Sequence, residues 1–180
     1  TGGDLEDLGG HADGAADLEA LLAGGSDDLG ADRLNLLGVL GGDGSFRGLH
    51  QFYKDFGIKF CGIPSTIDND INGTEYCLGV DTALNIIKVA IDSIRDTASS
   101  FKRAFVIETM GRDCGYLALI TALTSGAEMC LIPEVEYNLA DYEKKFKKEI
   151  EDGRTYFIAI VAEGIKQDSA EIAKWFEETA

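Results

Sequence analysis

The sequence predicts an α/β fold built from parallel-sheet sandwiches with helices on both faces, and three observations predict it. From residue 36 onward, short apolar runs of strand length alternate with longer segments whose apolar residues recur at helical spacing. Gly, Pro or paired Ser residues mark many of the junctions. Loops rich in Asp, Arg and Ser follow the predicted strands, which is where parallel sheets place their ligand-binding loops.

The expected elements follow one another in a regular order. A strand ends near residue 40, and the run 58–63 between Gly57 and Pro64 predicts a second one. Asp81 is the expected N-cap of the first long helix, and Gly126 is the expected end of the second. The remaining prediction comprises helices at 17–23, 81–100, 114–126, 141–153 and 169–180 and strands at 104–110, 128–133 and 155–164.

The composition excludes several classes of function. A net charge of −16 argues against binding to nucleic acid or to an anionic membrane surface. No apolar run has the length of a membrane span, and the N-terminus lacks the pattern of a signal peptide. The four cysteines show no metal-binding spacing, so we expect buried free thiols and a cytoplasmic location.

The stretch GGDGS (41–45) predicts a loop that binds phosphate. Glycine allows a ligand to approach the backbone closely. Asp43 alone would repel a polyphosphate, but a bridging Mg²⁺ accepts carboxylate and phosphate oxygens together. The sequence therefore favours a metal–phosphate complex at this loop.

The segment 64–70 follows the second strand and contains two neighbouring carboxylates. Asp68 and Asp70 flank an Asn in the stretch TIDND. Local turn hydrogen bonds would explain an isolated D-N-D equally well. Beside a phosphate loop, one of these carboxylates becomes a candidate base, and the hydroxyl of Thr66 a candidate phosphate ligand.

Two further candidates follow later strands. Gly111 permits a sharp bend after the strand 104–110, and Arg112 could then neutralise charge on a transferring phosphoryl group. The alternative for Arg112 is a surface ion pair with Asp113 or Glu108. Glu163 ends a strongly apolar strand and is expected to face a helix N-terminus or a ligand hydroxyl.

Taken together, these motifs resemble the ATP-dependent 6-phosphofructokinases. The blocks GGDGS, GIPSTIDNDINGT, GVDTALN, DSIRDTASSFKR, MGRDCGYLAL, GAEMCLIPE and IVAEG appear in unbroken order between residues 41 and about 165. The resemblance implies a two-lobed fold that this chain represents incompletely. Residues 1–79 would belong to the ATP-binding lobe and residues 80–180 would form most of the sugar-phosphate-binding lobe.

The resemblance also assigns roles. Asp68 would take the proton of the attacking sugar hydroxyl, Asp70 would tune that base, and Thr66 and Arg112 would steady the phosphoryl group. MgATP would contact Gly42, Asp43, Gly44 and Ser45, with Asp43 as the metal ligand. The sugar phosphate would contact Thr66, Ile67, Asp68, Arg103, Met110, Gly111, Arg112 and Glu163. Arg103 would reach the substrate of a neighbouring subunit, which implies a homo-oligomer, a tetramer by resemblance.

Two further implications concern nucleotides. Gly44 and Ser65 favour ATP as the donor, because pyrophosphate-dependent relatives tend to carry Asp and Lys at these positions. A nucleotide effector would contact Arg95, Gly126, Glu128 and Arg154, with Glu128 as the metal carboxylate. Asp152 departs from the family pattern, because an acid there would weaken binding of a diphosphate.

The implied reaction is transfer of a phosphoryl group from MgATP to the 1-hydroxyl of fructose 6-phosphate in glycolysis, giving fructose 1,6-bisphosphate and ADP. A chain of this length is expected to be inactive on its own. Two alternatives stay open at this point. One is a catalytically silent or regulatory subunit of the same family, and the other is a kinase of another acceptor among proteins that carry GGDG.

Overall fold

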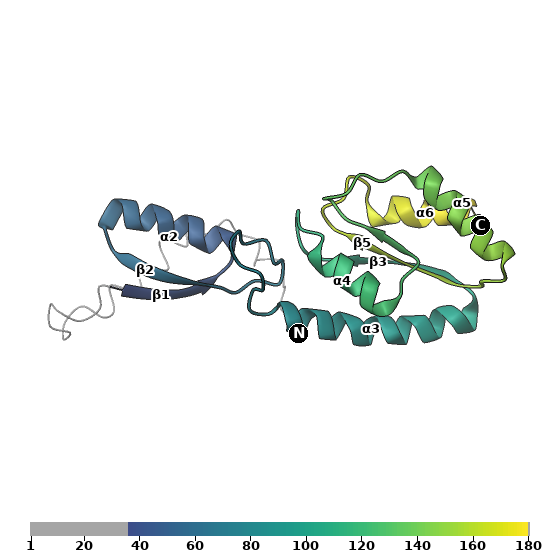
Figure 1. The fold of residues 1–180 in the computed structure, drawn as a ribbon, viewed down its shortest axis with the longest axis horizontal. Coiled ribbons are helices and arrows are strands. Elements are labelled where there is room, and N and C mark those ends of the chain that lie inside the picture. Colours follow the sequence, from purple (N-terminus) through teal and green to yellow (C-terminus); the bar gives the residue numbers. More distant parts are fainter. Residues whose placement is uncertain (1–35, 180) are drawn as a thin grey trace, which may run out of the picture. The chain divides into compact units, whose positions relative to one another are not determined.

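The computed structural model describes residues 36–179, and these divide into two compact units (Figure 1). The N-terminal unit ends at Ile63 and the C-terminal unit begins at Pro64. The lobe boundary after residue 79 that the resemblance implies stays a prediction. The helix expected at 17–23 lies outside the described residues.

The described part of the N-terminal unit contains two strands and a helix. Strand β1 (Leu36–Gly41) and strand β2 (Lys59–Pro64) form a two-stranded sheet, and α2 (Asp43–Phe56) lies between them in the chain. The expectation of a loop over residues 41–45 is wrong in one respect, because α2 already begins at Asp43. Only Gly42 separates β1 from the helix, so the GGDGS stretch comprises the last residue of β1, the N-cap Gly42 and the first residues of α2.

A three-stranded parallel sheet is the centre of the C-terminal unit. Its order is β3 (Ala104–Thr109), β5 (Phe157–Ala162) and β4 (Met129–Leu131). All six residues of β5 are buried, as expected for the central strand of a covered sheet. The predicted α/β class with a parallel sheet is confirmed.

Helices cover both faces of this sheet (Figure 1). Helices α3 (Val80–Phe101) and α4 (Tyr116–Ser125) pack on one face, where they meet alternate residues of β5, Ile158 and Ile160. Helices α5 (Leu139–Glu151) and α6 (Ser169–Thr179) pack on the other face against Ala159 and Val161. The period of two along a strand therefore divides β5 between two cores.

Helix α2 was not among the predicted helices. The termini of the other described elements lie within a few residues of the expected positions, with two corrections. Helix α3 has Gly79 as its N-cap, and Asp81 lies inside the first turn, where an acidic side chain complements the helix dipole. All four cysteines are free, as expected, but only Cys77 is buried, because Cys61 is exposed and Cys114 and Cys130 are partly buried. Gly126 caps α4 in the left-handed conformation, as predicted. Within the described residues, the helices are too short or too polar to cross a bilayer.

Candidate active site

The carboxyl ends of β3 and β5 bring two predicted site segments together. Thr109 is paired with Ala162 in the parallel register, and the N–H of Glu163 donates to the carbonyl of Thr109 over 3.0 Å. The Oε1 atom of Glu163 then accepts hydrogen bonds from the backbone N–H of Gly111, at 3.1 Å, and of Arg112. Glu163 therefore fixes the backbone of the loop that carries Arg112.

This loop depends on glycine at two positions. Gly111 has a φ of 143°, and a Cβ there would lie 2.3 Å from the carbonyl oxygen of Cys114. A Cβ on Gly164 would lie 2.0 Å from the carbonyl oxygen of Arg112. Arg112 itself has a φ of 51°, which is uncommon for a residue that is not Gly, Asn or Asp. The surrounding contacts thus hold Arg112 in an unfavourable backbone conformation.

Asp68 lies beside this loop and is the buried carboxylate of the candidate site. Only 8% of the residue is exposed, and its N–H donates to Oγ1 of Thr66 over 3.2 Å. The guanidinium Nε of Arg112 lies 3.5 Å from Oδ2 of Asp68, whereas most of the Arg112 side chain is exposed. Asp70 is exposed. The site therefore pairs a shielded carboxylate with a cation that remains accessible to a ligand.

Asp43 lies in the N-terminal unit, at a helix N-terminus. The free N–H groups of a first helical turn favour phosphate, and Gly42 and Ser45 flank Asp43 there. A Cβ on Gly41 would lie 2.5 Å from Oγ of Ser45, so this turn is packed tightly. Because Asp43 and Asp68 belong to different units, their approach to one another stays a prediction.

The residues near Asp43 fit a magnesium–nucleotide complex better than a metal bound by protein alone. Within residues 36–179, no three His, Cys, Asp or Glu side chains form a group that could hold a metal ion. Mg²⁺ commonly binds through one carboxylate together with substrate phosphates and water, and Asp43 can supply that carboxylate. The sequence did not indicate the exposed ion pair that Asp43 forms with Arg47, at 2.8 Å.

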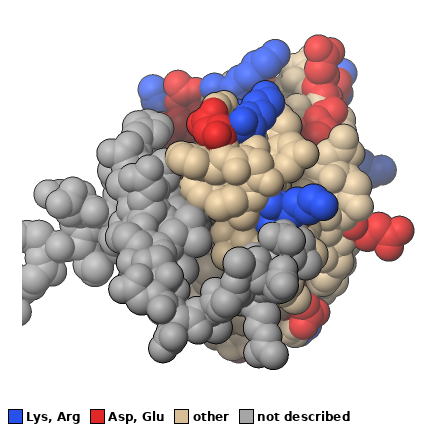
Figure 2. Space-filling model, turned by 90° about the vertical axis from the view of Figure 1, so that its left-hand side faces the viewer, with Lys and Arg blue, Asp and Glu red and all other residues tan. Residues whose placement is uncertain are grey.

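Basic and acidic side chains lie beside one another on the surface of the protein. Figure 2 shows both blue Lys and Arg side chains and red Asp and Glu side chains among uncharged residues. The net charge of −16 therefore coexists with local cations. An anionic ligand would have to be attracted by individual side chains such as Arg112, which can act at short range within a repulsive overall field.

The comparisons with known proteins decide the family. Residues 22–180 match the family model described as Phosphofructokinase. The chain belongs to the phosphofructokinase family. It is 72% identical over 151 residues to the ATP-dependent 6-phosphofructokinase of Sulfurimonas denitrificans, covering 84% of this chain and 47% of that relative. The corresponding enzyme of Sulfurovum sp. is 70% identical over 141 residues, covering 78% of this chain and 43% of that relative.

Solved phosphofructokinases have the same fold. The Saccharomyces cerevisiae structure matches with a TM-score of 0.75 at 28% identity, over 81% of this chain and 24% of that one. The Pichia pastoris phosphofructokinase in the T-state matches with a TM-score of 0.70 at 33% identity, over 80% of this chain and 17% of that one. The chain spans about half the length of the curated relatives it matches.

The other residues that the phosphofructokinase resemblance assigns to the sugar lie nearby or at the end of α3. Met110 is exposed beside Gly111, and Ile67 packs against the buried cluster of Cys77, Val80 and Leu117. Arg103 follows α3, and its guanidinium lies over the ring of Phe101, 5.6 Å from the centroid. Phe101 and Arg103 are both exposed, so Arg103 remains accessible from outside this unit.

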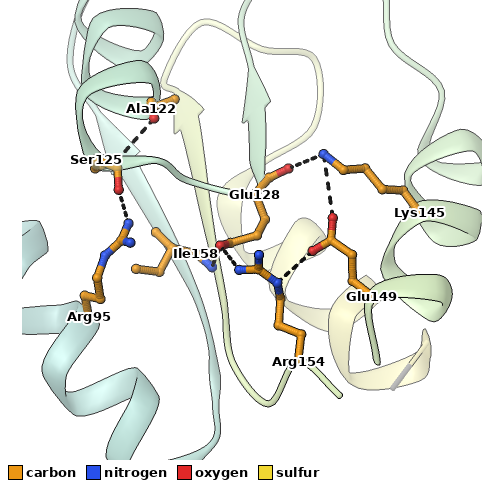
Figure 3. Close-up of polar contacts among 8 residues, drawn as sticks. All are labelled: Arg95, Ala122, Ser125, Glu128, Lys145, Glu149, Arg154 and Ile158. Carbon is orange, nitrogen blue, oxygen red and sulfur yellow. Dashed lines mark hydrogen bonds and ion pairs between the residues drawn. The ribbon is translucent and has the colours of Figure 1, made fainter. Parts of the chain in front are cut away.

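The residues assigned to a nucleotide effector form a polar cluster within the C-terminal unit (Figure 3). The N–H of Ile158 donates to Oε2 of Glu128 over 2.8 Å, and Arg154 pairs with Oε1. Arg154 also lies 3.0 Å from Glu149. Both carboxylate oxygens of Glu128 are therefore engaged, and an effector metal would have to displace these contacts.

Arg95 and Gly126 lie at the C-terminal end of α4. Arg95 donates to the carbonyl of Ser125 in the last turn of α4, and Gly126 is the C-cap of that helix (Figure 3). A cation at this position complements the negative end of the helix dipole. The effector assignment of all four residues stays a prediction.

Sequence reasoning did not single out two residues that hold the candidate site together. Asn69 has a φ of 57° and bonds to the 75–77 segment through its side chain. Glu134 accepts a hydrogen bond from the N–H of Gly115 over 2.7 Å, at the start of α4. The tolerance of Asn for the left-handed conformation was a signal for Asn69. No local signal identified Glu134, because its partner lies on another element.

Proposed function

We propose that the full-length protein transfers the γ-phosphoryl group of MgATP to the 1-hydroxyl of fructose 6-phosphate in the cytoplasm, giving fructose 1,6-bisphosphate and ADP. The observation that carries this proposal is the placement of the shielded Asp68 carboxylate 3.5 Å from the accessible guanidinium of Arg112. Curated relatives named ATP-dependent 6-phosphofructokinase, at 70–72% identity, support the choice of substrates.

In this proposal the carboxylate of Asp68 accepts the proton of the attacking hydroxyl. A general base must lie within hydrogen-bond reach of that proton, and burial keeps water from competing for the carboxylate. The hydroxyl of Thr66 accepts from the N–H of Asp68, so its own proton is available to a phosphate oxygen. Thr66 thereby orients the base and the phosphoryl group together.

Arg112 stabilises the charge that spreads over the transferring phosphoryl group. Its guanidinium is permanently charged and can form two parallel hydrogen bonds with phosphate oxygens. The contacts of Glu163 with the N–H groups of Gly111 and Arg112 fix the backbone from which this cation projects before substrate binds. A group that is positioned in advance avoids the free-energy cost of reorganisation during the reaction.

Asp43 would hold the Mg²⁺ that accompanies ATP, and that ion would neutralise charge on the phosphate oxygens. Gly42, Gly44 and Ser45 would line the phosphates in the first turn of α2. A Cβ on Gly44 would meet no atom within 4 Å, so the space beside this residue is open to a ligand. An open position here supports a nucleotide as the donor.

We also propose that the enzyme acts as a homo-oligomer in which Arg103 serves a neighbouring subunit. Supporting this, Arg103 is exposed at the end of α3 and lies on Phe101, which is 65% exposed. Along the same helix, Ile86 and Val89 are also exposed, although apolar side chains of this size are commonly covered. A contact with another subunit would cover them.

The proposed function is tested with the purified full-length protein by identifying the product. Fructose 6-phosphate, other sugar phosphates and NAD are offered as acceptors, each with MgATP or pyrophosphate as donor. We expect fructose 1,6-bisphosphate and ADP from the first acceptor with MgATP. Nucleotide binding without ADP formation would instead indicate a regulatory subunit, and a preference for another acceptor would indicate a different kinase.

A further inference from the structure

The segment 64–78 closes on itself around Asp68. At its ends, the N–H of Leu78 donates to the carbonyl of Pro64 over 2.9 Å. In its middle, Oδ1 of Asn69 accepts from the N–H of Cys77 over 2.9 Å, and Nδ2 of Asn69 donates to the carbonyl of Glu75 over 3.2 Å. The side chain of Asn69 is therefore the internal cross-link of this segment.

The far end of this cross-link is anchored in the protein core. Cys77 is 2% exposed and packs with Val80 and Leu117, which are fully buried. A loop residue bonded to such a position shares its rigidity, whereas a loop bonded only to water does not. Through Asn69, the segment that carries Asp68 is tied to the N-terminal ends of α3 and α4.

The backbone of Asn69 forms a second link, to the loop that carries Arg112. The Sγ atom of Cys114 lies 3.8 Å from the carbonyl oxygen of Asn69 and donates to it. Burial raises the pKa of the Cys114 thiol, and this increase, together with the nearby carboxylates of Glu134, Asp70 and Asp68, outweighs the lowering by a hydrogen bond from the backbone of Tyr116. The thiol therefore keeps the proton that this hydrogen bond requires.

We propose that Asn69 is a positioning residue of the phosphoryl-transfer site. Its side-chain amide holds the Asp68 carboxylate in place, and its carbonyl keeps the Asp68 segment beside the Arg112 loop. Both polar atoms of the amide bond to backbone groups of the 75–77 segment, so Asn69 acts on the position of Asp68 through the fold of this segment. The inference rests on the proposed role of Asp68 as the base.

A simpler explanation is that the chain needs Asn69 only for its positive φ. Asn tolerates the left-handed region better than most residues, and Gly tolerates it at no steric cost. Asn69→Gly retains the backbone conformation and removes both side-chain hydrogen bonds. Asn69→Ala removes the bonds and also strains the backbone. The Gly variant therefore separates the two explanations.

The test measures kcat and both KM values in the full-length protein for Asn69→Gly, Asn69→Ala and Asn69→Asp. In Asn69→Gly we expect kcat to fall by about 10- to 100-fold with both KM values changed by less than about threefold, because a misplaced base slows the chemical step. Asn69→Asp keeps the acceptor for the Cys77 N–H and is expected to retain more turnover than Asn69→Ala.

The matched control is Asn138→Ala. Oδ1 of Asn138 also accepts a backbone N–H, that of Ala140, as the N-cap of α5 and outside the candidate site. Its loss should lower Tm by a few degrees and leave kcat within about twofold of wild type. Asn69→Gly removes two side-chain hydrogen bonds and should lower Tm at least as much, but unlike Asn138→Ala it is expected to lower kcat by about 10- to 100-fold.

Several outcomes would overturn the inference. Wild-type kcat in Asn69→Gly would show that only the backbone conformation matters. Equal losses in Asn69→Asp and Asn69→Ala would show that the bond to Cys77 is not used, and this comparison also serves if Asn69→Gly fails to fold. Asp68→Asn is measured in parallel. If that variant turns over normally, the proposed role of Asp68 as the base fails and the inference fails with it; if it is inactive while Asn69→Gly is active, only the inference fails.

Discussion

Nε of Arg112 lies 3.5 Å from Oδ2 of Asp68, and the two residues stand on loops that follow different strands. One is an exposed cation in a left-handed conformation, and the other is a buried carboxylate. Arg112 thus contacts two carboxylates. Its guanidinium pairs with Asp68, and its backbone N–H donates to Glu163. We therefore expect mutations of Arg112 and of the residues that contact it to affect activity mainly by changing the orientation of its guanidinium group.

Arg112→Lys tests whether the shape of the cation matters. Lysine keeps the charge but cannot donate two parallel hydrogen bonds to a phosphoryl group. We expect kcat to fall by about 10- to 1,000-fold while KM for the sugar phosphate changes little, as for the loss of a contact made in the transition state. Steady-state kinetics of the full-length protein measure both. A wild-type kcat in Arg112→Lys would show that Arg112 acts only as a surface charge.

Gly164→Ala tests the close approach of the loop to β5. The added Cβ would lie 2.0 Å from the carbonyl oxygen of Arg112, so the loop must move. We expect both kcat and Tm to fall. Gly48→Ala is the control, because its Cβ meets nothing within 4 Å and it lies inside α2, where the change should stabilise by about 0.5–1 kcal/mol. Thermal unfolding and steady-state kinetics give Tm and kcat of the two variants. Equal Tm and kcat values in both would contradict the claim that Gly164 is required for close packing against Arg112.

Gly44→Asp tests the assignment of the donor. The open space beside Gly44 would receive a second negative charge next to Asp43, which should repel the phosphates of ATP. We expect KM for MgATP to rise by at least about tenfold, the effect of roughly 1.4 kcal/mol, with KM for the sugar phosphate unchanged. Gly44→Ala adds a methyl group without charge and should keep KM for MgATP near wild type. An unchanged KM for MgATP in Gly44→Asp would show that the phosphates of ATP do not bind beside Gly44.

Alkaline pH should destabilise the folded chain. Burial raises the pKa of the Cys130 thiol above its ordinary 9.0 and that of the Tyr142 hydroxyl above its ordinary 10.0. The unfolded chain releases these protons at a lower pH than the folded chain, so the free energy of unfolding falls as pH rises through this range. Urea unfolding between about pH 7.5 and pH 10.5 measures the decrease. The decrease should be smaller in Tyr142→Phe, and an identical decrease would contradict the assignment.

Much of the fold could be predicted because its signals are local. The run FIAIVA is apolar at every position, which is what a strand buried on both faces requires, and β5 lies at the centre of the sheet. Gly126 was identifiable as a helix end because it favours positive φ. Helix α2 was not predicted at all, because glycines usually break helices and the N-terminal turn of a helix is an exception.

The candidate site was only partly predictable, because several of its contacts depend on how the loops fold and leave no local signal in the sequence. The order of strands and loops was sufficient to expect Arg112 and Glu163 at one sheet edge. The hydrogen bonds that Asn69 makes to Glu75 and Cys77 depend on how the 64–78 segment folds back, and a D-N-D motif is equally compatible with an ordinary turn. The pairing of Glu128 with Arg154 likewise depends on the register of β4 and β5.

The most direct measurement of the central claim is the single-turnover rate of Asp68→Asn in the full-length protein, with fructose 6-phosphate and MgATP both saturating. Asn has nearly the same shape as Asp but cannot accept a proton, so we expect the rate to fall by about 10²- to 10⁴-fold while calorimetry still detects sugar-phosphate binding. A rate within a few-fold of wild type would contradict the claim that Asp68 is the base.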